Sequence, residues 1–225
     1  MKVSTRVHYG LRAMTELARS YADGGLLSAP VTHERIGIAP AERFDVVVDF
    51  SRYASGTAVT LRNIAGGDTT ADVMQFRVGR DERDDSRIPA RLADFEHLDP
   101  RNAVQTRTFT FRYGTHGGER RWTVNDLPFD PQRMDAQPAL GSTEIWYLKT
   151  DISHPIHLHL APFQVLSQGG RPRPTDGGWK DTLDLGAGRV ARVIVRFDGY
   201  KGRYVFHCHN LEHEDMAMMA NFEVV

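Results

Sequence analysis

Six of the chain's ten histidines fall in two short segments whose residue types could bind a transition metal. Residues 154–159 read HPIHLH, and residues 207–213 read HCHNLEH, which includes the single cysteine of the chain, Cys208. A lone histidine usually belongs to the core or the surface, but imidazoles clustered beside a thiol offer the nitrogen and sulfur ligands that copper and zinc prefer. The two segments are therefore the first candidates for a functional site.

The spacing of these histidines sorts them by face if both segments are strands. Side chains alternate between the two faces of a strand, so His157 and His159 face the same way, as do His207 and His209. Cys208 then faces the opposite way. One strand can thereby give a thiolate to one metal and imidazoles to others, joined by a few covalent bonds that could carry electrons.

A blue copper centre takes two imidazoles and one thiolate in a plane, with a weak axial thioether. The sequence offers Cys208 as the thiolate, His213 after a short turn, and His154 from the other segment. Met218 is the candidate for the axial position. The two segments therefore predict a complete type 1 copper site.

Two alternatives concern the ligands and the metal. Met216 and Met219 compete with Met218 for the axial position, since most methionines simply fill cores. Zinc also binds cysteine and histidine, but a structural zinc site uses four ligands. Six histidines, a cysteine and a methionine exceed that number, so we expect copper.

The elements that position these residues read as strands. Short runs rich in β-branched and aromatic residues alternate with turns of glycine, proline and aspartate, which predicts an all-β Greek-key sandwich. The expected strands cover residues 44–50, 57–61, 73–78, 106–113, 121–124, 143–149, 163–166, 189–197 and 202–208.

The N-terminal segment differs in pattern from the rest. Residues 5–21 place apolar side chains at helical spacing, before the glycines at 24 and 25. Residues 81–102 are polar and aperiodic, which is typical of a linker. We therefore expect an amphipathic helix in residues 1–25, a first β region at 26–80, a linker at 81–102 and a second β domain at 103–225.

Charge and hydropathy exclude several classes of partner. The 28 basic and 29 acidic residues nearly cancel, so no nucleic-acid partner is expected. No apolar run reaches the roughly 18 residues of a spanning helix, and residues 1–25 do not read as a secretory signal. We expect no membrane association, while the compartment stays open.

Residues 103–225 resemble the C-terminal cupredoxin domain of laccase-like multicopper oxidases, above all the bacterial spore-coat laccases and the bilirubin oxidases. Besides the two histidine segments, the matching motifs are WTVN at 122–125, GSTEIW at 141–146 and GWKDT at 178–182. The resemblance implies a cupredoxin-like sandwich that binds copper. It assigns the type 1 copper to His154, Cys208, His213 and Met218, the type 2 copper to His157, and the type 3 pair to His159, His207 and His209.

The resemblance also implies an activity: one-electron oxidation of phenolic or similar donors, coupled to reduction of dioxygen to water. Cys208 would carry electrons to the cluster, and Glu214 would relay protons, with an exposed turn glutamate as the alternative. Asp181 is expected to cap a turn, or else to orient a histidine.

The remaining histidines do not complete the trinuclear cluster. Residues 34–78 resemble the end of a middle cupredoxin domain, but the family's first domain, with its two His-x-His pairs, has no counterpart here. The other histidines are isolated: His8, His33, His97 and His116. The partners expected are therefore dioxygen, a small reducing substrate, and another chain that supplies the absent pairs. The alternative is a blue-copper electron-transfer fragment without oxidase activity of its own.

Residues 1–22 resemble the first helix of a small winged-helix family of bacterial repressors. No recognition helix follows, so DNA binding is not expected, and a copper-responsive regulator ranks last among the hypotheses. We interpret this segment as a fusion remnant.

Overall fold

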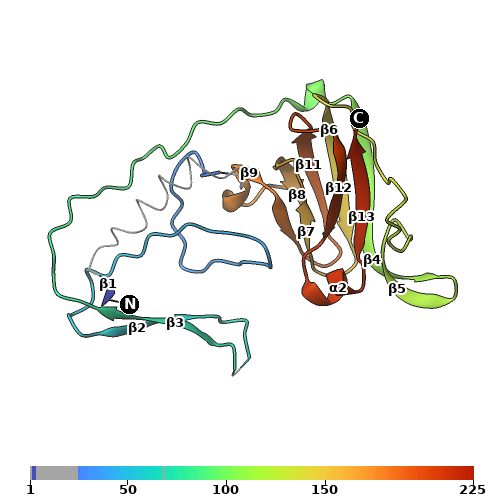
Figure 1. The fold of residues 1–225 in the computed structure, drawn as a ribbon. Coiled ribbons are helices and arrows are strands. Elements are labelled where there is room, and N and C mark those ends of the chain that lie inside the picture. Colours follow the sequence, from blue (N-terminus) through green and yellow to red (C-terminus); the bar gives the residue numbers. More distant parts are fainter. Residues whose placement is uncertain (1, 4–24, 68) are drawn as a thin grey trace. The chain divides into compact units, whose positions relative to one another are not determined.

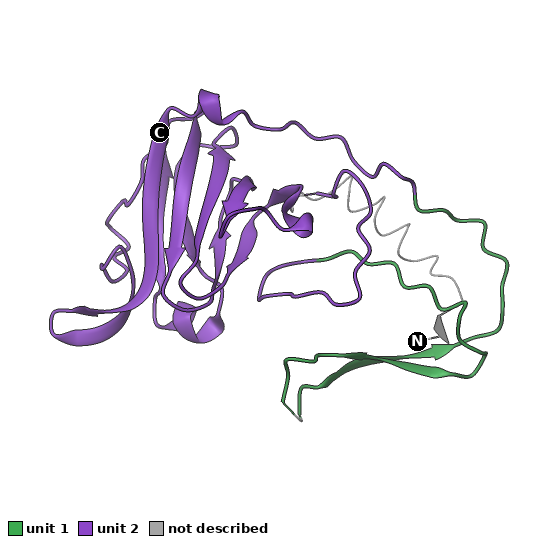
Figure 2. Ribbon diagram, turned by 180° about the vertical axis from the view of Figure 1, so that it is seen from behind, with its two compact units in different colours: residues 1–20, 44–88 green, residues 21–43, 89–225 purple. Residues whose placement is uncertain are grey.

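The computed structural model describes residues 2–3, 25–67 and 69–225, which divide into two compact units (Figure 2). Unit 1 comprises residues 1–20 and 44–88, and unit 2 comprises residues 21–43 and 89–225. Residues 26–43 are thus grouped with residues 89–225, and residues 44–80 with unit 1. The helix expected over residues 5–21 lies outside the described residues.

Unit 1 is a small sheet with the strand order β1-β3-β2. Strand β1 (Lys2–Val3) pairs parallel with β3 (Asp72–Val78), and β2 (Ala58–Arg62) pairs antiparallel with it. Two hydrophobic side chains of this unit are buried among the described residues, Phe50 and Val78. Much apolar surface therefore stays in contact with solvent, including Leu61 and Met74.

The strand expected at residues 44–50 does not form, so that prediction is wrong. Val46, Val47 and Val48 are exposed in an irregular segment. A β-branched run becomes a strand only when another strand completes its ladder of hydrogen bonds. The sequence pattern alone does not supply that partner.

Unit 2 is a sandwich of two sheets (Figure 1). The six-stranded sheet has the order β5-β4-β6-β11-β8-β9, and the four-stranded sheet has the order β10-β7-β12-β13. The six-stranded sheet contains β4 (Gln105–His116), β5 (Glu119–Val124), β6 (Thr143–Thr150), β8 (Phe163–Gln168), β9 (Trp179–Lys180) and β11 (Val190–Arg196). The four-stranded sheet contains β7 (His154–Leu158), β10 (Thr182–Leu185), β12 (Gly202–Cys208) and β13 (Met219–Val224). The short helices are η1 (Pro100–Asn102), η2 (Pro174–Asp176) and α2 (Leu211–Asp215).

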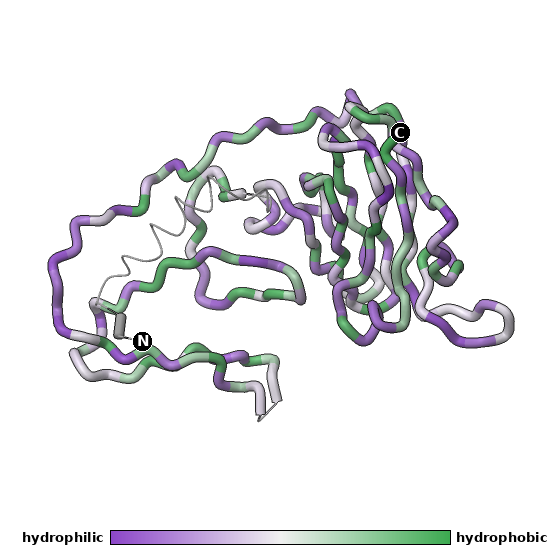
Figure 3. Tube along the Cα trace, viewed as in Figure 1, coloured by the Kyte–Doolittle hydropathy of each residue, from purple (hydrophilic) through white to green (hydrophobic). Residues whose placement is uncertain are grey.

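The two sheets of unit 2 enclose one apolar core. Phe109 and Trp146 from the first sheet pack against Phe206 from the second, with ring centroids 4.6–5.3 Å apart. Hydrophobic residues occur along the strands of the sandwich, interspersed with hydrophilic ones (Figure 3). The expected all-β, cupredoxin-like class is confirmed. None of the helices in the described parts of the chain is long and apolar enough to span a membrane.

The pairing of β7 with β12 brings the two histidine segments side by side. These strands are antiparallel neighbours, with His157 opposite His207 and Ile156 opposite Cys208. After β12, Asn210 caps α2 by accepting a hydrogen bond from the Glu212 amide. The chain then returns to β13, which pairs with β12. The fold thus places all the candidate ligands at one end of the four-stranded sheet.

Candidate metal centre

The structure brings His154, Cys208 and His213 together in the interior, at the end of the sandwich. The Nδ1 atoms of the two histidines lie 3.1 Å apart, and each lies 3.4 Å from the Cys208 Sγ. All three side chains are buried. Two imidazole nitrogens and one sulfur therefore converge on a common point, as a trigonal cupric site requires.

A carboxylate outside this group sets the orientation of His154. The His154 Nε2 lies 2.9 Å from the Asp151 carboxylate, so Nε2–H donates there and Nδ1 is left with its lone pair toward Cys208. Burial lowers the pKa of His154, and the nearby Asp151 opposes that shift. His154 is therefore neutral at pH 7, as a metal ligand must be.

Burial distinguishes the three candidate axial methionines. Met218 is fully buried in the core cluster that contains Cys208, whereas Met216 is exposed. The Met218 amide donates to the His213 carbonyl at 2.9 Å, and the Met218 carbonyl accepts from the Cys208 amide at 3.1 Å. Met219 starts the next strand and is half-buried. The backbone thus places Met218 beside two members of the buried group.

A second group of histidines comprises His157, His159 and His207, and one ring nitrogen from each lies within 4.8 Å of those of the other two. His159 and His207 are 3.1 Å apart at their Nε2 atoms. The His209 ring joins this group, with its centroid 5.2 Å from that of His207 and 5.7 Å from that of His157. This group is partly open to solvent, with His159 exposed and His207 buried.

Two neighbours fix the ring of His157. Its Nδ1 lies 3.1 Å from the Asp181 carbonyl oxygen and 2.9 Å from the Thr182 hydroxyl. Nδ1–H therefore donates, and Nε2 is left to bind a metal. Burial, with the charges of nearby histidines, lowers the pKa of His157 to about 4, against the opposing charge of Asp181.

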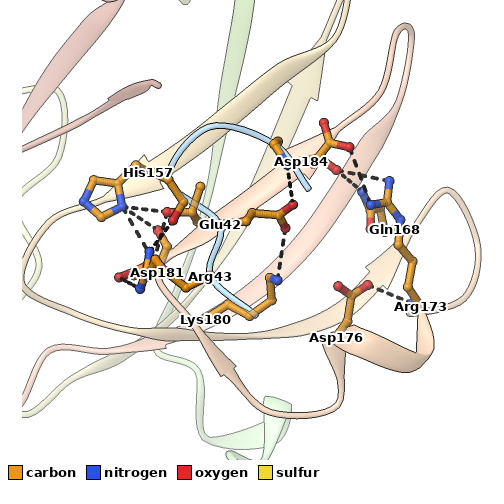
Figure 4. A network of polar contacts seen from close by, with 12 residues as sticks. Glu42, Arg43, His157, Gln168, Arg173, Asp176, Lys180, Asp181 and Asp184 are labelled. Carbon is orange, nitrogen blue, oxygen red and sulfur yellow. Dashed lines mark hydrogen bonds and ion pairs between the residues drawn. The ribbon is translucent and has the colours of Figure 1, made fainter. Parts of the chain in front are cut away.

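The Asp181 carboxylate is held in turn by Arg43, a residue that sequence reasoning missed. The Arg43 guanidinium donates two hydrogen bonds to Asp181, at 2.8 and 2.6 Å, and the Lys180 ammonium lies 3.1 Å from Glu42 (Figure 4). Asp181 thus contacts the histidine through its backbone and an arginine through its side chain. The sequence marks this network only by two adjacent charged residues, Glu42 and Arg43.

Glu214 lies near the second group. Its carboxylate is 3.7 Å from the Nδ1 of His207, and its side chain is about one-third exposed at 32%. Its charge opposes the lowering of the His207 pKa by burial. The Glu214 carboxylate thus lies close to the histidines and is partly open to solvent, as a group that carries protons between the two must be.

The donor set fits copper. Nitrogen and sulfur ligands with a buried thioether match a blue copper site, and four imidazoles suit further copper ions. The Nδ1 of His209 is buried without a hydrogen-bond partner in the described structure. Burial raises the pKa of Cys208 to about 11. At neutral pH this thiol therefore loses its proton only when a metal binds the sulfur.

No further histidine of the described residues joins these groups. His97 packs against Phe95, with ring centroids 4.8 Å apart, and the His116 Nδ1 lies 3.3 Å from the Asp126 carbonyl. His33 is exposed and lies in an irregular segment. The second group therefore contains four imidazoles.

The chain is similar to several known proteins. The multicopper oxidase family model matches residues 97–225. A laccase of Bacillus stratosphericus is 38% identical over 235 residues, and a bilirubin oxidase of Albifimbria verrucaria is 38% identical over 223 residues. A crystal structure of a multi-copper oxidase from Pediococcus acidilactici superposes with a TM-score of 0.79 at 32% identity.

These matches cover most of this chain and less than half of each relative. They span 91% of the chain and 46% of the Bacillus laccase, 89% and 38% for the bilirubin oxidase, and 90% and 42% for the Pediococcus structure. The family model alone covers more than half of the chain and contains both groups of candidate ligands. The chain belongs to the multicopper oxidase family.

Proposed function

We propose that the chain is the copper-binding C-terminal part of a laccase-like multicopper oxidase. Such an enzyme would oxidise phenolic or similar donors one electron at a time and reduce dioxygen to water. The observation that carries this proposal is the arrangement around β12. Cys208 belongs to the buried group, while its neighbours His207 and His209 belong to the open group.

The proposal assigns each ligand to a copper. The type 1 copper would be held by His154, Cys208, His213 and Met218. His157 would bind the type 2 copper, and His159, His207 and His209 would bind the type 3 pair. Copper bound in these sites would supply one-electron redox chemistry, and the protein would supply binding, orientation and electrostatics.

The chain's own residues would divide the remaining work. Cys208 is joined to His207 by one peptide bond, so electrons would cross the strand through a covalent path. Asp181 and Thr182 would hold His157 with Nε2 directed away from β10. Glu214, 3.7 Å from His207, would deliver protons from solvent.

The domain assignment belongs to the same proposal. Residues 103–225 would form the copper-binding cupredoxin domain, residues 26–80 the end of a middle domain, and 81–102 the linker between them. The other histidines of the trinuclear cluster would come from a polypeptide segment that carries two His-x-His pairs. The open, four-histidine face supports that requirement.

A second candidate function is a blue-copper electron-transfer module. Its basis is that all candidate ligands of the buried group belong to this chain. It would accept and pass single electrons without consuming dioxygen.

The test is to load the purified chain with copper and record visible absorption and oxygen uptake with a phenolic donor. A blue band supports the type 1 assignment. Oxygen uptake that begins only when a chain with the two His-x-His pairs is added supports the oxidase. A blue band without oxygen uptake in that mixture would reject the oxidase and support the electron-transfer module.

A further inference from the structure

Trp122 covers the His213 member of the buried group. The two rings are stacked, with centroids 3.7 Å apart and planes inclined by 28°. The same indole meets the His154 ring edge-on at 5.8 Å. His213 is consequently only 6% exposed. A donor molecule in solution cannot lie against the imidazole face that the indole covers.

Tyr113 continues this stack outward. It pairs with Trp122 across the antiparallel strands β4 and β5, and the two ring centroids are 4.6 Å apart. Trp122 is half-buried, and Tyr113 is 40% exposed. The three aromatic rings therefore form a continuous series from solvent to a candidate copper ligand. Electron tunnelling weakens steeply with distance, and this series divides the path from solvent to His213 into short steps.

A guanidinium lies at the outer end of this series. The Arg120 Cζ is 4.4 Å from the centroid of the Tyr113 ring, and Arg120 donates a hydrogen bond to the Tyr113 carbonyl at 3.2 Å. The neighbouring arginines are neutralised, Arg112 by Asp126 and Arg121 by Glu119. Arg120 forms no ion pair with any carboxylate of the described residues, so its charge is available to an anionic ligand.

We propose that Tyr113 and Trp122 form the electron-entry site of this chain, and that Arg120 selects aromatic donors that carry a carboxylate. This inference rests on the proposed type 1 site. The donor packs against the exposed part of the Tyr113 ring, and its carboxylate binds the Arg120 guanidinium. A phenolic donor loses one electron and its phenolic proton to become a phenoxyl radical. The electron passes through the Tyr113, Trp122 and His213 rings and reduces one bound cupric ion to cuprous ion, while the proton passes to solvent.

The first experiment measures single-electron reduction without oxygen. The copper-loaded chain is mixed anaerobically with syringate, and the loss of the blue band is followed by stopped flow. Trp122→Leu is expected to slow this loss markedly, because the electron must then cross the gap that the indole filled, whereas Trp122→Phe retains most of the rate. Tyr113→Leu is expected to slow it less, and Tyr200→Leu, at a tyrosine 76% exposed, is the matched control with no effect.

The outcomes separate the inference from the proposed function. Failure of the wild-type chain to turn blue would reject the type 1 assignment itself. A normal blue band in Trp122→Leu, with an equal or faster reduction, would overturn the inference, because the indole would then only shield His213. If Trp122→Leu fails to bind copper normally, the comparison of Tyr113→Leu with the wild type decides in the same way.

The second experiment tests the role of Arg120 by binding. Benzoate, which is redox-inert, is titrated into the copper-free chain while the Trp122 indole signal is followed by NMR. Arg120→Gln should weaken benzoate binding about threefold, as expected for an exposed ion pair, and Arg101→Gln, which removes the same charge at η1, should not. Arg120→Gln should also slow reduction by syringate without slowing reduction by its uncharged methyl ester. Equal effects on acid and ester would overturn the assigned selectivity.

Discussion

The two faces of β12 carry similar metal-binding side chains, which are buried on one face and partly open to solvent on the other. On the inner face, Cys208 meets His154 and His213 in the apolar core, and all three are buried. On the outer face, His207 meets His157 and the exposed His159. The inner group has the ligand set proposed for one blue copper centre, while the outer group has four imidazoles.

The two faces differ in whether this chain alone could supply all the ligands of the proposed site. A site whose ligands all project into one core is fixed when that core folds. The trinuclear cluster proposed for the outer face would need further ligands from beyond the sheet. The inner group is thus predicted to work alone, and the outer group to depend on a partner.

The largest expected effect concerns the inner face. Cys208→Ser removes the thiolate, and with it the sulfur-to-copper charge transfer that colours a blue copper centre. We expect complete loss of the blue band on copper loading, measured by visible absorption. His209→Ala, on the outer face, is the control and should leave the band intact. A band that survives in Cys208→Ser would contradict the type 1 assignment.

The next effect concerns the core that supports the inner group. Phe206 is 1% exposed and meets Phe109 edge-to-face at 4.6 Å. Phe206→Ala should lower the free energy of unfolding by about 3–5 kcal/mol, because a cavity forms. Denaturant unfolding of the copper-free chain measures this loss, and Phe206→Leu should lose clearly less. A loss below about 1 kcal/mol would show that the core does not depend on this ring.

A smaller effect is expected on the outer face. Thr182→Val removes the hydroxyl that lies 2.9 Å from the His157 Nδ1, with little change of shape. Copper affinity of the outer histidines should fall about tenfold, as for other residues that orient a metal-bound histidine. Isothermal titration of the assembled protein measures it. Thr182→Ser should retain the affinity, and the blue band should not change in either variant.

The pKa of His157 gives a dependence on pH. Burial lowers the pKa of His157 from 6.5 to about 4 in the folded chain. Between these values the unfolded chain binds more protons, so the free energy of unfolding falls as pH falls from about 6.5 to about 4. Denaturant midpoints of the copper-free chain at pH 7, 5.5 and 4.5 measure this, and His157→Gln should flatten the slope. A midpoint that does not change with pH in the wild type would contradict the burial of this ring.

The smallest effect is expected in unit 1. Leu61 is 52% exposed on β2, so Leu61→Ala removes little buried surface. We expect a change in the free energy of unfolding below about 0.5 kcal/mol in the chain alone. A larger loss in complex with a partner chain than in the chain alone would indicate that the partner covers this strand.

Local patterns predicted much of unit 2. The period-two spacing of residues 207–209 correctly separates Cys208 from its two neighbours, because alternation along a strand depends on the backbone alone. Six expected strands between residues 106 and 208 correspond to β4, β5, β6, β8, β11 and β12, with ends that differ by up to three residues. That these residues bind copper is still a prediction.

Contacts between distant segments could not be predicted in the same way. Arg43 contacts Asp181 across 138 positions, and Trp122 on β5 contacts His213 in α2. Neither contact leaves a periodic signal, because it depends on how strands and loops are arranged. The missing strand at residues 44–50 has the same cause, since its hydrogen bonds require a partner that the local pattern does not specify.

A copper titration tests the difference between the two faces most directly. Copper is added stepwise to the reduced chain, and the blue absorption and the total bound copper are measured at each step. The inner group predicts that the blue band saturates at one copper per chain, in the wild type and equally in a variant that lacks His157, His159 and His209. A blue band that requires these outer histidines, or that never forms in the chain alone, would contradict the account.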